Sequence, residues 1–211
     1  GNILISEYYE GASYNKYLEL FNPTDEDIDL TGYFVGACSN AHSDGDNPEN
    51  LYETTHPFPD GDTLYAKDTY VITRDNADAA IVEMGDWVTT ENHPCNFNGN
   101  DWIGIYDPDG ALLDAFGVTP SATNPPDHDV AGVTGAAKDH LIYRDIEVLG
   151  GNDGDWDGGT YEDSDWIVVD LAATVAEDIV DLGYHYVNLP ELDDLVMIEG
   201  TVEEYYGETE I

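Results

Sequence analysis

The stretch that decides the fold class is residues 102–116, with the sequence WIGIYDPDGALLDAF. Two runs rich in aromatic and aliphatic residues flank the connection Asp107-Pro108-Asp109-Gly110. This connection has Pro and Gly where a tight turn needs them, and its Asp residues suit a turn as well. The stretch therefore predicts a β-hairpin in which Asp107 and Asp109 are turn residues.

Short apolar runs of the same kind recur along the chain and are separated by turn residues. No long segment keeps a period of 3.6 residues, and residues 79–83 fit no more than one or two helical turns. Many short strands with frequent turn signals are typical of an all-β sandwich or barrel. The further predicted strands are residues 2–8, 16–21, 32–35, 69–73, 141–144 and 166–169.

The composition changes near the C-terminus, at residues 188–194, which read NLPELDD. We therefore predict a β domain over residues 1–188, a linker over 189–194 and a C-terminal strand within 195–211. A lone strand leaves its backbone groups unpaired. It therefore has three expected fates: to pair back onto its own domain, to begin a following domain, or to pair with a neighbouring molecule.

The charge is the most unusual property of the chain. Its 211 residues contain 46 Asp and Glu but 5 Lys and Arg, so the formal net charge is −41. A hydrophobic content of 41% with 15 Tyr and 4 Trp argues against disorder and supplies a core. So few cations exclude a basic groove for nucleic-acid phosphates, and no run of about 18 apolar residues predicts a membrane span.

Repulsion at this charge density opposes compaction and has to be offset. Two compatible explanations are a very salty medium, which screens charges, and calcium bound by clustered carboxylates. No basic and apolar signal segment precedes Gly1, which fits a mature or excised form of a secreted chain.

The two cysteines, Cys38 and Cys95, favour a disulfide in an oxidising compartment. The alternative is a zinc site, because His42 follows Cys38 by four residues and His93 precedes Cys95 by two. The His-x-Cys spacing is unusual for zinc, so the disulfide is the preferred hypothesis.

The sharpest local motif is DGDWDG, residues 153–158. It matches the start of a calcium loop, in which alternate side chains converge on one ion and Gly permits a sharp turn. The twelfth position is Ser164 rather than Glu, so a full EF-hand is not expected. The alternative is a solvated Asp/Gly turn. The predicted ligands are Asp153, Asp155, Asp157, the carbonyl of Gly159, and Asp163 or Asp165.

A second candidate for calcium is the acidic loop that contains Asp44, Asp46 and Glu49, although it lacks a third spaced oxygen and the turn Gly. Glu7, Glu10 and Glu19 come from neighbouring predicted strands. One interpretation is that they converge, and the preferred one is that they are carboxylates at the rim of the sandwich. His128, between two Asp residues, is expected to face solvent. These interpretations assign no role in catalysis.

Catalytic motifs are not found in the sequence. There is no H-E-x-x-H pattern, no G-x-S-x-G nucleophile elbow and no phosphate-binding loop. The sequence therefore predicts a protein that is not an enzyme.

Several segments resemble lamin tail domains, and the resemblance covers most of residues 2–187. It implies an immunoglobulin-like β-sandwich, here with long acidic loops at 38–62 and 150–165 that depart from the family pattern. The family is an interaction module and offers no catalytic residues. The segments that carry the resemblance are ILISEY (3–8), LELFNP (18–23), IDLTGY (28–33), WIGIYDPDG (102–110), SDW (164–166) and LGYH (182–185).

The resemblance also implies a setting. In bacteria such domains occur in secreted proteins, often ahead of an oligonucleotide/oligosaccharide-binding fold and a nuclease, and residues 196–211 look like the start of such a fold. Two hypotheses follow. The first is a calcium-stabilised extracellular adhesion or assembly module that acts on itself or on another extracellular protein domain, with a homo-oligomer or filament formed through residues 195–211. The second is the N-terminal accessory domain of a secreted nuclease.

Overall fold

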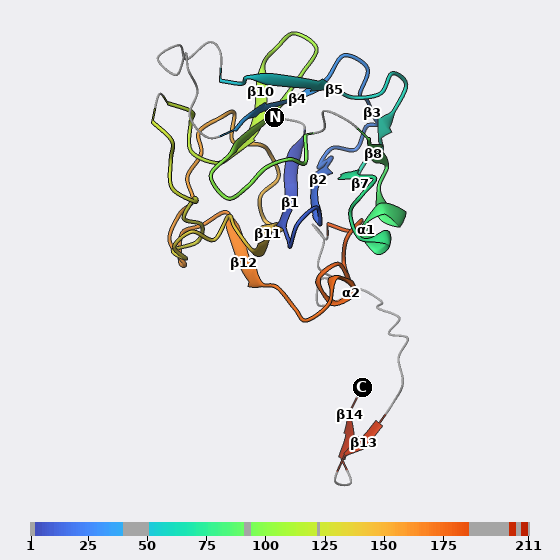
Figure 1. Cartoon of the computed structure of the whole chain (residues 1–211). Helices are drawn as coiled ribbons and strands as arrows, with labels where there is room; N and C mark the ends of the chain where they lie inside the picture. Colours follow the sequence, from blue (N-terminus) through green and yellow to red (C-terminus); the bar gives the residue numbers. More distant parts are fainter. Residues whose placement is uncertain are drawn as a thin grey trace.

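The computed structural model describes residues 3–39, 51–90, 94–121 and 123–185, and the backbone of residues 203–205 and 208–210. Within the first four ranges, a six-stranded and a four-stranded β-sheet pack face to face (Figure 1). The predicted all-β sandwich is confirmed. Within the described residues, neither helix has the length and apolar character that a bilayer crossing requires.

The larger sheet has six strands in the order β12-β11-β1-β2-β7-β8. All neighbours are antiparallel except β7 and β8, which are parallel. Each of the predicted strands at 2–8, 16–21, 69–73, 141–144 and 166–169 overlaps one of these elements. The bounds are β1 Leu4–Glu10, β2 Lys16–Phe21, β7 Thr69–Arg74, β8 Trp87–Thr89, β11 His140–Arg144 and β12 Trp166–Asp170.

The smaller sheet has four antiparallel strands in the order β10-β9-β4-β5. The predicted hairpin is its β9–β10 pair. At the turn, the Asp107 carboxylate accepts hydrogen bonds from the backbone N–H of Asp109 and Ala111, at 2.9 and 2.8 Å. The bounds are β4 Phe34–Cys38, β5 Thr54–Pro57, β9 Trp102–Tyr106 and β10 Leu112–Phe116.

Shorter elements complete the sandwich. β3 (Ile28–Asp29) pairs with β6 (Thr63–Leu64), and α1 (Ala79–Met84) confirms the helical turns predicted at 79–83. α2 (Val175–Asp178) follows β12. The elements β3, β6, β8 and α2 were not predicted because two to four residues are too few to show a period.

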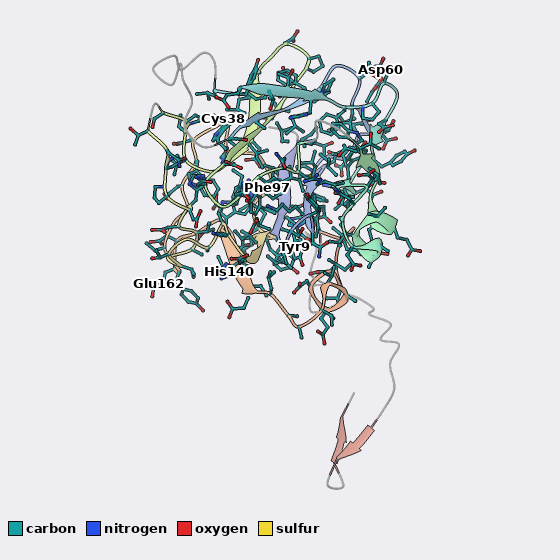
Figure 2. All side chains as sticks on the ribbon, viewed as in Figure 1. Tyr9, Cys38, Asp60, Phe97, His140 and Glu162 are labelled. Atoms are coloured by element: carbon teal, nitrogen blue, oxygen red, sulfur yellow. The ribbon has the colours of Figure 1, made fainter. Side chains whose placement is uncertain are left out.

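Side chains from both sheets meet in one central core. Tyr8 stacks on Phe97 and on Phe116, with ring centroids 4.4 and 4.0 Å apart. Figure 2 shows Phe97 near the middle of the molecule. A second apolar cluster lies on the outer face of the six-stranded sheet, around Tyr9 and Leu182, and a third lies on the outer face of the four-stranded sheet, around Trp102.

Two irregularities reverse the side-chain alternation. The register of β1 shifts between Ile5 and Glu7, so Ile5 faces the central core while Glu7 points to the outer face beside Glu19. The register of β10 shifts between Leu112 and Asp114, so Leu112 lies in the outer cluster while Asp114 turns inward. A β-bulge has this effect because one extra residue flips every residue that follows it.

Near the C-terminus, β13 (Glu203–Tyr205) pairs with β14 (Glu208–Glu210) in an antiparallel sheet of their own. The C-terminal strand predicted within 195–211 stays a prediction, because most of that segment lies outside the described residues. The predicted linker, 189–194, lies outside the described residues. The boundaries 1–188, 189–194 and 195–211 stay predictions.

Candidate functional site

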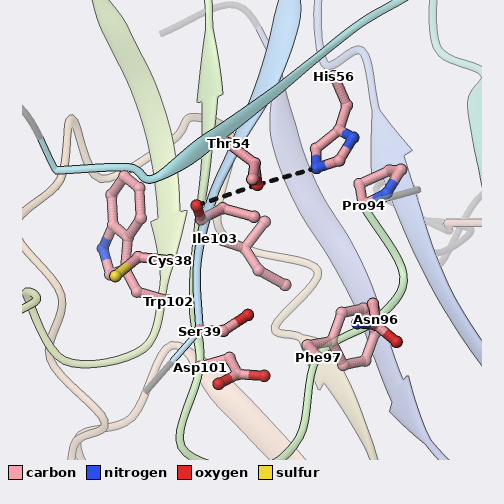
Figure 3. A pocket seen from close by; sticks show the side chains of 11 residues that line it. Cys38, Ser39, Thr54, His56, Pro94, Asn96, Phe97, Asp101, Trp102 and Ile103 are labelled. Atoms are coloured by element: carbon pink, nitrogen blue, oxygen red, sulfur yellow. Dashed lines mark hydrogen bonds between the residues drawn. The ribbon is translucent and has the colours of Figure 1, made fainter. Parts of the chain in front are cut away.

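A hollow with polar and apolar walls lies at one end of the four-stranded sheet and has a volume of about 200 Å³ (Figure 3). His56, on β5, is buried, and its Nε2 lies 3.1 Å from the hydroxyl of Thr54. The other labelled side chains come from β4, β9 and the segment 94–101. The lining residues are Ala37, Cys38, Ser39, Thr54, His56, Pro94, Asn96, Phe97, Asp101, Trp102 and Ile103.

The sulfur in this hollow is not a nucleophile at neutral pH. Burial raises the pKa of the Cys38 thiol to about 12, and the nearby carboxylates of Glu53 and Asp101 add to the shift. The attacking species in cysteine chemistry is the thiolate, which a pKa this high suppresses. The hollow therefore holds a Cys38 thiol that stays protonated at neutral pH.

The disulfide predicted between Cys38 and Cys95 is not formed, and both residues are free and buried. The four-stranded sheet separates them. Cys38 lies in the outer cluster with Trp102, whereas Cys95 lies in the central core and donates its S–H to the carbonyl of Ile72 at 3.2 Å. The alternative zinc site includes His42 and His93, which lie outside the described residues.

The DGDWDG motif begins with a turn at Asp153-Gly154, closed by a hydrogen bond from the N–H of Asp155 to the carbonyl of Asn152 at 2.9 Å. Asp153, Asp155 and Asp157 are exposed, while Trp156 between them packs against Phe116, with ring centroids 4.7 Å apart. The three Asp side chains are therefore the ones that face solvent, while Trp156 packs inward. The carboxylate of Asp157 accepts the N–H of Gly159 at 2.8 Å, and Asp163 and Asp165 are also exposed.

The glycines of the motif allow close packing. A Cβ on Gly158 would lie 2.2 Å from the carbonyl oxygen of Asp129, and one on Gly154 would lie 2.4 Å from the Leu112 side chain. Asn152 binds both the N–H and the C=O of Ala115, at 2.9 and 2.8 Å, so this loop covers the edge of β10.

Metal ligands do not gather in the part of the chain that the structure describes. There, no group of three or more His, Cys, Asp or Glu side chains is placed to hold a metal ion. The second predicted calcium loop, with Asp44, Asp46 and Glu49, lies outside the described residues. Calcium binding stays a prediction.

Three carboxylates of β1 and β2 do not lie where they were predicted from the sequence. Glu7, Glu10 and Glu19 are not at the rim, because all three are buried. Glu10 forms an ion pair with Lys16 at 2.6 Å. Glu7 and Glu19 face each other across β1 and β2, and no cation is paired with either of them within the described residues.

The Glu7–Glu19 pair is held by hydrogen bonds. Glu7 accepts from the hydroxyl of Tyr17 at 2.8 Å, and Glu19 accepts from the hydroxyl of Ser6 and the N–H of Gly183, both at 2.7 Å. Burial raises the pKa of Glu19 to about 7, against the effect of these bonds. Burial, followed by the Glu19 charge, also raises the pKa of Glu7 well above its usual range.

Residues 171–185, here called the C-terminal cover, lie over this pair and over the outer apolar cluster. Leu182 is buried in that cluster. Tyr9 donates to Asp178 and Tyr143 donates to Asp181, each at 2.8 Å. These bonds attach the C-terminal cover to β1 and β11, and they exclude water from the two carboxylates.

His128 also differs from its prediction, because it is buried rather than facing solvent. Its Nε2 lies 3.1 Å from the carbonyl oxygen of Asp101, and its Nδ1 has no hydrogen-bond partner among the described residues. Burial lowers the pKa of this imidazole. His128 therefore supports the fold as a neutral side chain at neutral pH.

Residues 1–120 match the profile of the family described as Lamin Tail Domain. The chain belongs to the lamin tail domain family. The resemblance noted in the sequence is thereby confirmed, together with the immunoglobulin-like fold that it implied. No curated protein matches the chain.

The matched part of this lamin tail domain runs from β1 through β10. Two strands beyond it, β11 and β12, extend the six-stranded sheet through the pairing of β11 with β1. The C-terminal cover and the DGDWDG loop also lie beyond the match. Glu7 and Glu19 thus lie on strands within the matched range, and the segment that covers them lies beyond that range.

Proposed function

We propose that this lamin tail domain is a non-catalytic module that works outside the cell in adhesion or assembly and is stabilised by calcium. The observation that carries the proposal is the use of its buried ionisable groups. Asp114 binds Arg144, Glu10 binds Lys16, and the two carboxylates beneath the C-terminal cover are hydrogen-bonded. These groups stabilise a rigid sandwich, which suits a module whose role is to present a surface.

Calcium is proposed on grounds of charge. A net charge of −41 favours any divalent cation that bridges carboxylates, and exposed Asp side chains on the 153–165 loop are available to it. Because these side chains do not converge, binding there requires backbone carbonyls and water to complete the six to eight oxygens that calcium prefers.

Stabilisation by calcium is tested by measuring the melting temperature at moderate salt, once with calcium and once with a chelator. A ligand present at 100 times its dissociation constant stabilises the folded state by about 2.7 kcal/mol. Asp155→Ala with Asp157→Ala should remove most of the response. The matched control is Asp60→Ala with Asp109→Ala, which removes the same charge at exposed sites. A melting temperature that does not respond to the chelator contradicts this part of the proposal.

The test of assembly is sedimentation velocity and electron microscopy of the full chain. Oligomers or filaments should increase in millimolar calcium and decrease with chelator, because cations screen the repulsion between copies. Deletion of residues 191–211 should abolish them if the C-terminal segment makes the contact. A chain that stays monomeric in calcium contradicts self-assembly and leaves adhesion to another protein as the role.

A second candidate function is the accessory domain of a secreted nuclease. The observation that favours it is the β13–β14 hairpin, which pairs with no strand of the sandwich among the described residues. Such a hairpin is what the start of a following fold would contribute. The test is the reading frame that follows Ile211: a downstream fold with paired metal-binding carboxylates supports this function, and a stop codon contradicts it.

A further inference from the structure

The strand β12 lies at the edge of the six-stranded sheet and carries exposed apolar side chains. Its neighbour is β11, and no other strand within the described residues pairs with it. Ile167 and Val169 are 48% and 40% exposed on the outer face, while Trp166 and Val168 point toward the core. An apolar edge strand of this kind is a template for another strand.

The other edges of the six-stranded and four-stranded sheets are protected. The 150–154 loop covers β10, with Asn152 and the N–H of Asp153 bonded to its backbone. β5 ends in Pro57, and β8 has three residues. Proteins usually protect edges by covering them, shortening them or placing Pro there. β12 has none of these protections in the described part of the chain.

An apolar groove runs beside β12. It has a volume of about 380 Å³, and the exposed side chains of Val133 and Tyr161 form its far wall. An extended chain paired with β12 would place every second side chain in this groove. The lining residues are Ala131, Val133, Tyr161, Trp166, Ile167 and Val168.

Exposed carboxylates lie close in sequence to the residues that line the groove. Exposed acidic side chains lie before β12, at Glu162, Asp163 and Asp165, and at its end, at Asp170. Figure 2 shows Glu162 at the periphery of the molecule. A neighbouring hollow, built by the adjoining segments 125–129 and 156–159, adds Asp127, Asp129 and Asp157 around Trp156. A second copy of the chain, also at −41, would be repelled here, whereas a cationic segment would be attracted.

We propose that β12 and its groove bind an extended, basic segment of another protein, in which apolar residues alternate with Lys or Arg. The segment adds a strand to the sheet edge, its apolar side chains enter the groove, and its cations meet these exposed carboxylates. This inference rests on the proposed role of the chain as a protein-binding module and names the partner of that role.

The experiment uses a blocked seven-residue peptide of alternating Val and Lys, titrated into the full chain at low salt. Amide chemical shifts should change at residues 166–170, and affinity should fall at least tenfold in 0.5 M salt. A peptide N-methylated on alternate residues tests backbone pairing, and a Val/Glu peptide tests charge. Both should bind at least tenfold more weakly than the Val/Lys peptide.

Two variants locate the site. Val133→Lys places a cation in the groove and should weaken binding about tenfold, while Val180→Lys adds the same charge at an exposed site on the C-terminal cover and should change it less than twofold. Equal effects of the two variants, equal binding of the N-methylated peptide, or no binding at millimolar peptide overturns the inference. The calcium assembly test does not involve the peptide, so failure of the proposed function is recognised separately.

Discussion

At two sites in this molecule a β-bulge orients a buried carboxylate. The two sites differ in the group that faces this carboxylate. The bulge in β10 turns Asp114 inward, where Arg144 donates to it at 2.5 Å and the N–H of Ile5 at 2.7 Å. The bulge in β1 turns Glu7 outward, where it faces Glu19. One carboxylate is paired with a cation, and the other is paired with a second carboxylate.

The comparison shows how burial and nearby charges together set the pKa of a carboxylate. At the inner site, burial raises the pKa of Asp114, while the Arg144 guanidinium and backbone donors lower it. At the outer site no cation opposes burial, so the pKa values of Glu7 and Glu19 are raised, that of Glu19 to about 7. Burial outweighs the donors at the inner site, so the pKa of Asp114 is also raised overall, while that of Glu19 is raised to about 7.

The largest effect is expected when the inner site loses its cation. Arg144→Met leaves the buried Asp114 with backbone donors but without a cation, and it also removes the contact between the guanidinium and the Trp166 ring, now 3.8 Å. Removing one partner of a buried pair costs about 3–5 kcal/mol of unfolding free energy. Urea denaturation measures this loss.

The control is the double variant Asp114→Leu with Arg144→Met, which removes both charges. It should be more stable than Arg144→Met alone, because no charge is left unpaired. A loss below about 1 kcal/mol for the single variant would show that water or a rearrangement solvates Asp114.

The outer site should make stability depend on pH. Because the folded-state pKa of Glu19 is about 7 and its usual value is 4.5, its contribution is complete below pH 4.5 and is lost as pH rises through 7. The loss is on the order of 3 kcal/mol at 1.36 kcal/mol per pKa unit. Denaturation between pH 4.5 and 8 at constant salt measures it.

Glu19→Gln should flatten this dependence, because an amide does not titrate. The exposed Glu147→Gln removes the same charge and should leave the pH dependence of the wild-type chain nearly unchanged. Parallel curves for wild type and Glu19→Gln would mean that the pair does not titrate as described.

The C-terminal cover is expected to affect both the stability of the fold and the pKa of Glu19. Leu182→Ala removes a buried side chain from the outer cluster and should cost about 2–3 kcal/mol. Because it also admits water above Glu19, the pKa of this residue should move back toward 4.5 and the pH dependence should weaken. A stability loss with an unchanged pH profile would assign the exclusion of water to other residues.

The smallest effect is expected from single hydrogen bonds of the cover. Tyr143→Phe deletes the bond to Asp181 and should cost about 1 kcal/mol. Tyr9→Phe, which deletes the equivalent bond to Asp178, is the matched comparison. Hydrogen exchange at the amide of Gly183 should become faster in both variants if the cover is attached through these bonds.

Much of the fold was predictable from local pattern. The hairpin at 102–116 carried its own turn residues, and β2, β7, β11 and β12 were long and regular enough to show as aromatic and β-branched runs. The predicted calcium loop shows the limit of a local pattern. Its alternating Asp residues fitted both an ion-binding loop and a solvated turn, and the Asp side chains face solvent while Trp156 packs against Phe116.

The roles of Glu7, Asp114 and the cysteines were decided by tertiary structure. A one-residue bulge inverts the face of every later residue in a strand, and nothing in the sequence marks Ser6 or Leu113 as the point of inversion. Two cysteines indicate a disulfide by number alone, yet a β-sheet lies between them. The sequence by itself determined the strands, the turns and the charge, because these follow from neighbours along the chain. The sides that Glu7 and Asp114 face depend on neighbours across the sheets, which only the folded chain brings together.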